Sequence, residues 1–355
     1  MILSRLRLEN LRCLSRTELV LHRGANLVIG ANGSGKTSLL EAAYLLGRGR
    51  SFRTRYLAQL LQYGTDRLWV AGEVGLEEPD RLVRRLDVQF ERNRSIVARI
   101  DSQPVHSLAE LAEVFPIQVV DPGIHRLVEE GPARRRRWLD WAVFHVEPRF
   151  LDSWLHYGRA LRQRHGALEQ GSDPAPWEIE MVRYGEVLSA VRARVMAALQ
   201  PHWTETLQRL DAPPASLRFE RGWSENETLE GSLSRHRHRD REQRRTSRGP
   251  HRFDVRLEVD GRPARDVVSR GQQKLLGAAM TVVLMRYVAE TAGRVPTLLL
   301  DDPAAELDEA HARALLQVAR QLDAQQIITA LDPSNLPTLA PDRVFHVERG
   351  MVKTV

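Results

Sequence analysis

The chain contains very little lysine and cysteine, and each shortage limits what the protein can be. Of its 52 lysine and arginine residues, only Lys36, Lys274 and Lys353 are lysines. Cys13 is the one cysteine, so an internal disulfide is excluded and a reducing compartment is expected. The N-terminus lacks a basic-then-apolar signal pattern, and the apolar stretch near Gly277 to Met285 is too short to predict a membrane span. We therefore expect a cytoplasmic protein that does not bind membranes.

The bulk composition is that of a sizeable globular protein. With 355 residues the chain is long enough for a large core and two lobes, and its hydrophobic content of 42% is ordinary. The net charge of +6 favours a polyanionic partner.

One of the three lysines lies in a glycine-rich loop. Residues 30–37 read G-A-N-G-S-G-K-T, between an apolar stretch at 26–29 and a helix-forming stretch at 38–46. A strand, a glycine loop and a helix start form an anion site, because loop amides and the helix dipole point at phosphate. Arginine does not serve at Lys36, where a compact ammonium must reach between phosphates. A chance glycine turn is the competing interpretation, which both flanking elements disfavour.

The run matches the Walker A pattern in full and predicts a nucleotide site. The predicted nucleotide-binding residues are Gly30, Ala31, Asn32, Gly33, Ser34, Gly35, Lys36, Thr37 and Ser38. Lys36 is also expected to act catalytically, and the Thr37 hydroxyl to bind a magnesium ion.

A second motif follows an apolar strand near the other end of the chain. Leu298 to Leu300 lead into Asp301 and Asp302, which is the Walker B arrangement. Asp301 is expected to hold magnesium, and Asp302 to orient or deprotonate the attacking water. An acidic turn after a buried strand is the alternative for this motif alone.

The segment 268–273, V-S-R-G-Q-Q, is similar to the signature sequence of ABC-type ATPases, with Arg270 where glycine is usual. Ser269, Gly271 and Gln272 are predicted to bind nucleotide, since a helix starting there would point its positive end at an anion. A serine cap of any helix looks similar, but the order of the three motifs favours the ATPase interpretation.

Smaller elements fit the same plan. Gln118 is predicted as a magnesium ligand at the end of a strand, and residues 305–308 resemble the D-loop. Thr329 stands where many ABC ATPases carry histidine, and threonine cannot take up a proton as imidazole does. This departure disfavours a transporter subunit.

Hydrophobic periodicity predicts an α/β fold with a helical second lobe. Strands are predicted within 6–8, 19–21, 26–29, 68–74, 82–90, 96–100, 117–120, 253–259, 297–300, 327–328 and 344–347. Helical patterns cover 133–210, broken at 171–174, and then 272–291 and 309–323. The charged stretch 234–252 is predicted as a mobile loop or solvated helix. We expect lobe I at 1–122 plus 292–355, and lobe II at 123–291.

In this order the motifs resemble the RecF family, bacterial recombination mediators related to Rad50 and SMC ATPase heads. Further matching segments are Leu8-Glu9-Asn10-Leu11-Arg12, Gly49-Arg50-Ser51-Phe52-Arg53, Gly131-Pro132 with Arg135-Arg136, Leu139-Asp140-Trp141, Val143 to Pro148, and Gly249-Pro250-His251-Arg252 with Asp254. Ala305 departs from the usual serine of the family's D-loop, and Phe253 is larger than the usual residue there.

The resemblance implies a P-loop ABC-type ATPase head, Rad50-like, with a mainly helical second lobe bearing a short helical hairpin. It implies ATP and Mg²⁺ as cofactors, a homodimer on ATP binding with Ser269 closing on the partner's nucleotide, and slow ATP hydrolysis. It also implies binding to single- and double-stranded DNA, and cooperation with RecR and RecO in loading RecA at gaps.

Two other functions stay open at this point. One is a nucleotide-gated DNA scaffold like SMC or Rad50, whose hydrolysis is incidental, and the other is an ABC transporter ATPase subunit. Three arginine-rich groups could contact DNA phosphates, within 48–55, 134–137 and 234–252. Aromatic residues are not interleaved with them, so sequence-independent contacts are expected.

Overall fold

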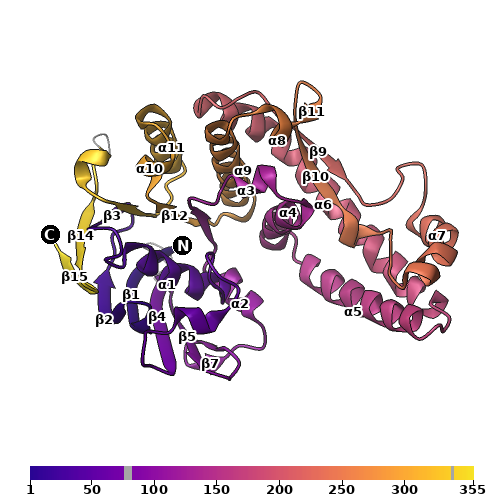
Figure 1. Ribbon diagram of the computed structural model, residues 1–355, viewed down its shortest axis with the longest axis horizontal. Coiled ribbons are helices and arrows are strands. Elements are labelled where there is room, and N and C mark those ends of the chain that lie inside the picture. The colour runs from indigo at the N-terminus through magenta and orange to yellow at the C-terminus, as the bar shows by residue number, and fades with distance from the viewer. Residues whose placement is uncertain (76–81, 337–339) are drawn as a thin grey trace. The chain divides into compact units, whose positions relative to one another are not determined.

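The computed structural model describes residues 1–75, 82–336 and 340–355, which fall into two compact units (Figure 1). Unit 1 comprises Met1–His125, Arg209–Ala212 and Lys274–Val355, and unit 2 comprises Arg126–Gln208 and Pro213–Gln273. Residues 274–291 were expected in lobe II, but the structure groups them with unit 1. A Cβ atom at Gly277 would lie only 2.6 Å from the Ile124 carbonyl oxygen, so this helix packs closely on the unit 1 chain.

Unit 1 contains a mainly parallel sheet with the strand order β15-β14-β3-β13-β12-β8. Its strands are β3 (Ala25–Ile29), β8 (Ile117–Val120), β12 (Thr297–Asp301), β13 (Gln326–Ala330), β14 (Arg343–Glu348) and the antiparallel edge strand β15 (Met351–Thr354). All residues of β12 and β13 are buried, as expected for central parallel strands covered on both faces.

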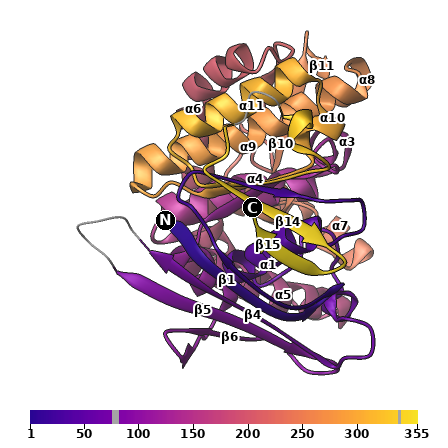
Figure 2. The same cartoon turned by 90° about the vertical axis from the view of Figure 1, so that its left-hand side faces the viewer.

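A second, antiparallel sheet in unit 1 has the order β2-β1-β4-β5-β6-β7 (Figure 2). Its strands are β1 (Ile2–Leu11), β2 (Leu14–Val20), β4 (Arg67–Gly75), β5 (Val83–Glu91), β6 (Val97–Ile100) and β7 (Gln103–Pro104). Buried and exposed residues alternate along β4 and β5, so one face meets the core and the other carries polar side chains.

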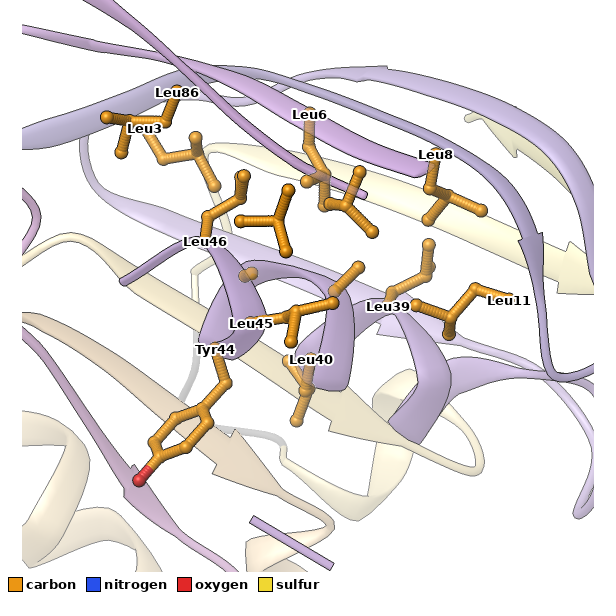
Figure 3. Packing of buried hydrophobic residues seen from close by; sticks show 14 of the residues in the cluster. Leu3, Leu6, Leu8, Leu11, Leu39, Leu40, Tyr44, Leu45, Leu46 and Leu86 are labelled. Carbon is orange, nitrogen blue, oxygen red and sulfur yellow. The ribbon is translucent and has the colours of Figure 1, made fainter. Parts of the chain in front are cut away.

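Helix α1 (Lys36–Arg48) lies in the core of unit 1. Figure 3 shows its leucines packed against leucines of β1. Two glycines permit this close packing. A Cβ atom at Gly47 would lie 2.6 Å from the Phe115 carbonyl oxygen, and one at Gly72 would lie 2.6 Å from the Leu46 side chain. A helix buried on nearly every side is therefore fixed in position by its neighbours.

The other helices that contribute to unit 1 are α2 (Leu108–Val114), α9 (Arg270–Ala292), α10 (Pro303–Glu306) and α11 (Glu309–Gln321), with short 3₁₀ turns η1 (Leu57–Leu60) and η3 (Pro333–Asn335). By length and composition α9 could cross a membrane, contrary to the expectation from the apolar stretch alone. However, 67% of its apolar window is buried, and the core helix of a soluble protein passes the same test.

Unit 2 is mainly helical, with a three-stranded sheet in the order β11-β10-β9. Its elements are α3 (Arg126–Glu129), α4 (Pro132–Val146), α5 (Phe150–Glu169), α6 (Ala175–Arg209), β9 (Ser216–Glu220), α7 (Leu229–Gln243), η2 (Pro250–Arg252), β10 (Asp254–Val259), β11 (Arg262–Pro263) and α8 (Ala264–Val267). Helices α5 and α6 form the predicted hairpin. The sequence did not predict β9, and most of the charged stretch folds as α7, which the Thr228 hydroxyl caps.

A fully buried arginine joins three helices of unit 2. The Arg164 guanidinium of α5 donates to Glu178 Oε1 of α6 at 2.9 and 3.1 Å. It also donates to Asp240 Oδ2 of α7 at 2.9 Å and to Thr246 Oγ1 at 2.8 Å. Neither Arg164 nor Asp240 is exposed to solvent, so the Asp240 carboxylate depends on Arg164 for charge compensation.

We predict that Arg164→Ala destabilises the protein by about 3–5 kcal/mol, because it leaves the Asp240 carboxylate buried without its partner. Urea unfolding followed by far-UV circular dichroism measures this loss. Arg162→Ala, an exposed arginine on the same helix, is the matched control and should change stability by less than about 0.5 kcal/mol. Equal effects of the two substitutions would contradict the structural role of Arg164.

Candidate nucleotide-binding site

The loop between β3 and α1 is held in a conformation that only glycine adopts easily. Gly30, Gly33 and Gly35 have φ angles of 150°, 78° and 119°. A Cβ atom at Gly30 would lie 2.3 Å from the Val347 carbonyl oxygen, and one at Gly35 would lie 2.9 Å from the Leu14 side chain. The loop backbone therefore packs against its neighbours on two sides, which fixes its shape.

The other residues of the predicted loop differ in exposure. Ala31, Asn32 and Gly33 are exposed at the turn, whereas Ser34 and Ser38 are buried. Helix α1 begins at Lys36, and the first N–H groups of a helix have no intrahelical acceptor. The loop thus ends in a set of donors suited to an anion.

Lys36 is held against this loop and shielded from solvent. Its Nζ atom donates to the carbonyl oxygens of Gly30 at 2.6 Å and Ala31 at 3.1 Å, and 7% of the residue is exposed. Burial lowers the pKa of Lys36, while the nearby carboxylates of Asp302 and Asp301 raise it. The pKa is lowered overall because desolvation of the ammonium outweighs its attraction to the two carboxylates. A bound phosphate would add a further attraction to the ammonium.

Three side chains and one backbone N–H group form a hydrogen-bonded chain beside Lys36. The hydroxyls of Thr37, on α1, and Thr329, on β13, each donate to Asp301 Oδ1 at 2.9 Å. The backbone N–H of Asp302 donates to the Thr329 hydroxyl at 2.9 Å. Asp302 itself has a left-handed backbone with φ 48°, which aspartate tolerates better than most residues. These contacts fix both carboxylate-bearing residues at the end of β12.

The residues present fit a phosphate chain and its metal. Positive-φ glycines, a helix start and an ammonium group suit phosphate oxygens. The Thr37 hydroxyl and the Asp301 carboxylate, which already contact each other, are oxygen donors of the kind that magnesium prefers.

The structure corrects the placement of Gln118, which the sequence predicted as a magnesium ligand. In the parallel pair of β8 and β12, Gln118 lies opposite Leu298, three residues before Asp301. That offset corresponds to about 10 Å along the strand. The strand continues past Gln118 to Val120, which lies opposite Leu300, and Asp121 and Asp301 are the residues that follow this pair.

Asp121 and Asp301 line one small pocket together with Lys274 of α9. No motif in the sequence marks Asp121, which only the packing of strands and helices brings to this pocket. The sequence marks Thr329 only as a replacement for histidine, whereas in the structure its hydroxyl donates to Asp301.

Ser269, Gly271 and Gln272 belong to unit 2, at the start of α9. The Ser269 hydroxyl accepts a hydrogen bond from the Gln272 N–H at 3.3 Å, and the Gln272 side chain accepts from the Ser269 N–H at 2.9 Å. This reciprocal pair is a capping box. Gly271 is exposed, and a Cβ atom there would meet nothing within 4 Å, so no packing among the described residues requires glycine.

Comparison with known proteins identifies a matching family and similar relatives. The family model described as RecF/RecN/SMC N terminal domain matches residues 2–353. The chain is 38% identical to the DNA replication and repair protein RecF of Pseudomonas putida (strain GB-1), covering 99% of this chain and 98% of that protein. It is 39% identical to the protein of the same name from Stutzerimonas stutzeri (strain A1501), covering 99% and 97%.

Solved structures show the same fold. The structure of the recombination mediator protein RecF-ATP in the RecFOR pathway aligns with a TM-score of 0.89 at 24% identity, covering 100% of this chain and 97% of that one. The SmcHead bound to the C-winged helix domain of ScpA aligns with a TM-score of 0.61 at 16% identity, covering 100% and 98%.

We predict that Lys36→Met leaves the ligand-free protein at least as stable as the wild type, because it removes a desolvated charge. The stabilisation by Mg-ATP, about 2.7 kcal/mol at a hundredfold excess over Kd, should be lost. Thermal unfolding with and without Mg-ATP measures both effects. Lys36→Arg keeps the charge but not the compact shape, so a wild-type ATP shift in that variant would refute the need for an ammonium.

Proposed function

The chain belongs to the RecF family of RecF/RecN/SMC N-terminal domain proteins, and we propose that it is an ATP-dependent DNA-binding protein of recombinational repair and replication. The observation that carries this proposal is the chain of hydrogen bonds from Thr37 through Asp301 and Thr329 to Asp302, beside Lys36. It supplies every group that ATP binding and hydrolysis require from one subunit.

Each residue of the site has a distinct chemical role. The loop 30–35, the start of α1 and Lys36 bind the phosphates of ATP. Thr37 and Asp301 hold Mg²⁺, which neutralises phosphate charge when bound. Asp302 accepts a proton from the attacking water or orients it. Its side chain is one methylene shorter than glutamate, and Thr329 offers no second base, so hydrolysis is slow and resets a switch.

The signature residues act on a second copy of the chain. Ser269 and the exposed Gly271 at the start of α9 present a hydroxyl and an uncovered backbone, which suit a phosphate on another molecule. ATP binding therefore drives a homodimer in which Ser269 closes on the nucleotide held by the partner. Gln272 keeps Ser269 in place through the capping box.

The dimer binds DNA where single- and double-stranded regions meet, and it works with RecR and RecO in loading RecA. The names of its relatives support this assignment, since they are DNA replication and repair proteins and a recombination mediator of the RecFOR pathway. A scaffold that binds DNA but does not need hydrolysis is the second candidate. The short carboxylate of Asp302 is the feature that favours it.

We predict that Asp302→Asn preserves ATP binding and slows ATP turnover at least tenfold, so that the ATP-bound dimer persists. The amide keeps the shape and loses the basic carboxylate. Turnover is measured by phosphate release, and dimer lifetime by sedimentation after excess ADP is added. Asp323→Asn, at an exposed carboxylate, is the control. Unchanged turnover in the Asp302 variant would overturn its role, and unchanged DNA release would favour the scaffold.

We predict that Ser269→Arg binds ATP with near-normal affinity as a monomer but fails to dimerise. The bulky side chain blocks the approach of the partner, and its loss of the helix cap costs about 1 kcal/mol. Ser269→Asp separates these effects, since aspartate keeps the cap but repels a phosphate. In sedimentation with ATP both variants should remain monomeric, and both should still bind a fluorescent ATP analogue. Normal dimerisation of Ser269→Asp would show that Ser269 does not contact the partner's nucleotide.

A further inference from the structure

The three arginine-rich groups differ in how far their charges are already compensated within the chain. In the group at 134–137, Arg135 forms a bidentate pair with Asp254 at 2.9 Å, and Arg136 donates to the Phe253 carbonyl oxygen at 3.0 Å. Arg134 pairs with Glu130. These three arginines make contacts within unit 2.

The arginines of the group at 48–55 differ in whether they already have a partner within the chain. Arg53 lies 3.6 Å from the buried Glu41 carboxylate, and the Arg48 guanidinium lies over the Tyr44 ring. Arg50 and Arg55 are exposed, but they follow the C-terminal end of α1, about 20 Å along the helix from the phosphate loop. Among the described residues, this group therefore offers a partner only two exposed arginines that lack a carboxylate.

The group at 234–252 has the most arginines without a carboxylate partner, five of its eight. Three others are paired, with Arg235, Arg237 and Arg241 bound to Glu227, Glu178 and Asp173. Among the residues that the structure describes, no acidic group lies within ion-pair distance of the remaining five, of which Arg252 donates to the Thr246 carbonyl oxygen at 3.1 Å. We call the other four the α7 arginine cluster: Arg239, Arg244, Arg245 and Arg248.

The backbone that carries this cluster is rigidly held. The buried Asp240 side chain accepts from the Ser247 N–H at 3.0 Å, and the Thr246 N–H donates to His165 Nε2 at 3.1 Å. The Arg164 guanidinium joins Asp240 and Thr246 to α5. These hydrogen bonds fix the end of α7 and the turn that follows it. Little backbone entropy is therefore lost when the arginines of the cluster bind an anion.

The spacing and chemistry of the cluster point to an extended polyanion. Arginine stays charged at every physiological pH and forms bidentate contacts with phosphate. Arg239 lies in the last turns of α7, and Arg244 caps the helix. Five residues of helical rise separate them by about 7.5 Å along the helix axis, which spans about two phosphates of one duplex strand. No Phe, Tyr or Trp occurs between residues 235 and 249, so the cluster lacks the large aromatic rings on which bases usually stack.

Resting on the DNA-binding function proposed above, we propose that the α7 arginine cluster binds the phosphate backbone of duplex DNA without regard to sequence. The paired arginines beside it keep the helix in place, and the four uncompensated ones form the contact. The cluster belongs to unit 2, whereas the phosphate loop belongs to unit 1.

The test compares two triple variants with equal loss of positive charge. The first is Arg239→Gln, Arg244→Asn and Arg245→Gln, where asparagine suits the left-handed backbone at residue 244. The control is Arg5→Gln, Arg7→Gln and Arg16→Gln, whose arginines pair with glutamates on the antiparallel sheet. Binding of two unrelated duplexes is titrated across salt concentration with ATP present.

The cluster variant should flatten the slope of log affinity against log salt by up to about 2.7, since each phosphate contact contributes about 0.9. The control should keep the wild-type slope. Equal losses in both variants, or no loss in the cluster variant, would overturn the proposal while leaving the DNA-binding function intact. A wild-type protein that binds neither duplex with ATP would instead refute the proposed function itself.

A second measurement applies even if the triple variant folds poorly. In a Cys13→Ser background, His238→Cys introduces a single thiol on the exposed face of α7, where a photoactivatable cross-linker is attached. Asp66→Cys, at an exposed position in unit 1, is the matched control. Cross-linking to duplex DNA from residue 238 and not from residue 66 supports the proposal, and the reverse pattern refutes it.

Discussion

Unit 1 depends on one constraint: helix α1 must be buried along its length while its first turn stays open to phosphate. Leucines of the antiparallel sheet pack on one side of the helix (Figure 3), and the parallel sheet supplies the loop that precedes it. The close approaches at Gly47 and Gly72 leave no room for the helix to shift. Because the helix cannot move, the loop before it and the Thr37 hydroxyl stay aligned with Asp301 on β12.

Several buried charged side chains are paired with groups of opposite charge, and these pairs connect segments that are distant along the chain. Glu41 on α1 is fully buried, and its carboxylate accepts from the Arg12 guanidinium at 2.7 and 2.9 Å and from the Ser51 hydroxyl at 2.6 Å. Removing one partner of such a group would leave a charge that water cannot reach. Some arginines of this chain thus compensate buried carboxylates, as Arg12 does for Glu41 and Arg164 for Asp240.

The candidate nucleotide site contains backbone conformations that few residues adopt easily. Gly30 and Gly35 take conformations in which a side chain would collide with neighbouring atoms, and Asp302 takes a left-handed backbone directly after β12. Such conformations persist only where surrounding contacts hold them, here the Thr329 hydroxyl and the packing of Leu14 and Val347. Desolvation of the Lys36 ammonium is a further cost that phosphate binding would offset.

The sequence by itself determined the nucleotide loop, the acidic pair Asp301 and Asp302, and the α/β fold class, because these rest on local patterns of glycine, charge and periodicity. It also gave the helical hairpin of α5 and α6, whose apolar stripes and polar break are local. It could not give the register of the parallel strands. For that reason it selected Gln118, whereas the residue that lines a pocket together with Asp301 is Asp121.

Only the tertiary structure decided which distant side chains meet. Arg12 and Ser51 come from separate motif segments, and the fold joins both at Glu41. The three arginine-rich groups were equivalent in sequence, since the composition of a charged stretch does not reveal its partners. The fold distinguished them by bringing carboxylates to some guanidinium groups and none to others. Pairing between residues far apart in sequence depends on how strands and helices pack, and no local pattern encodes it.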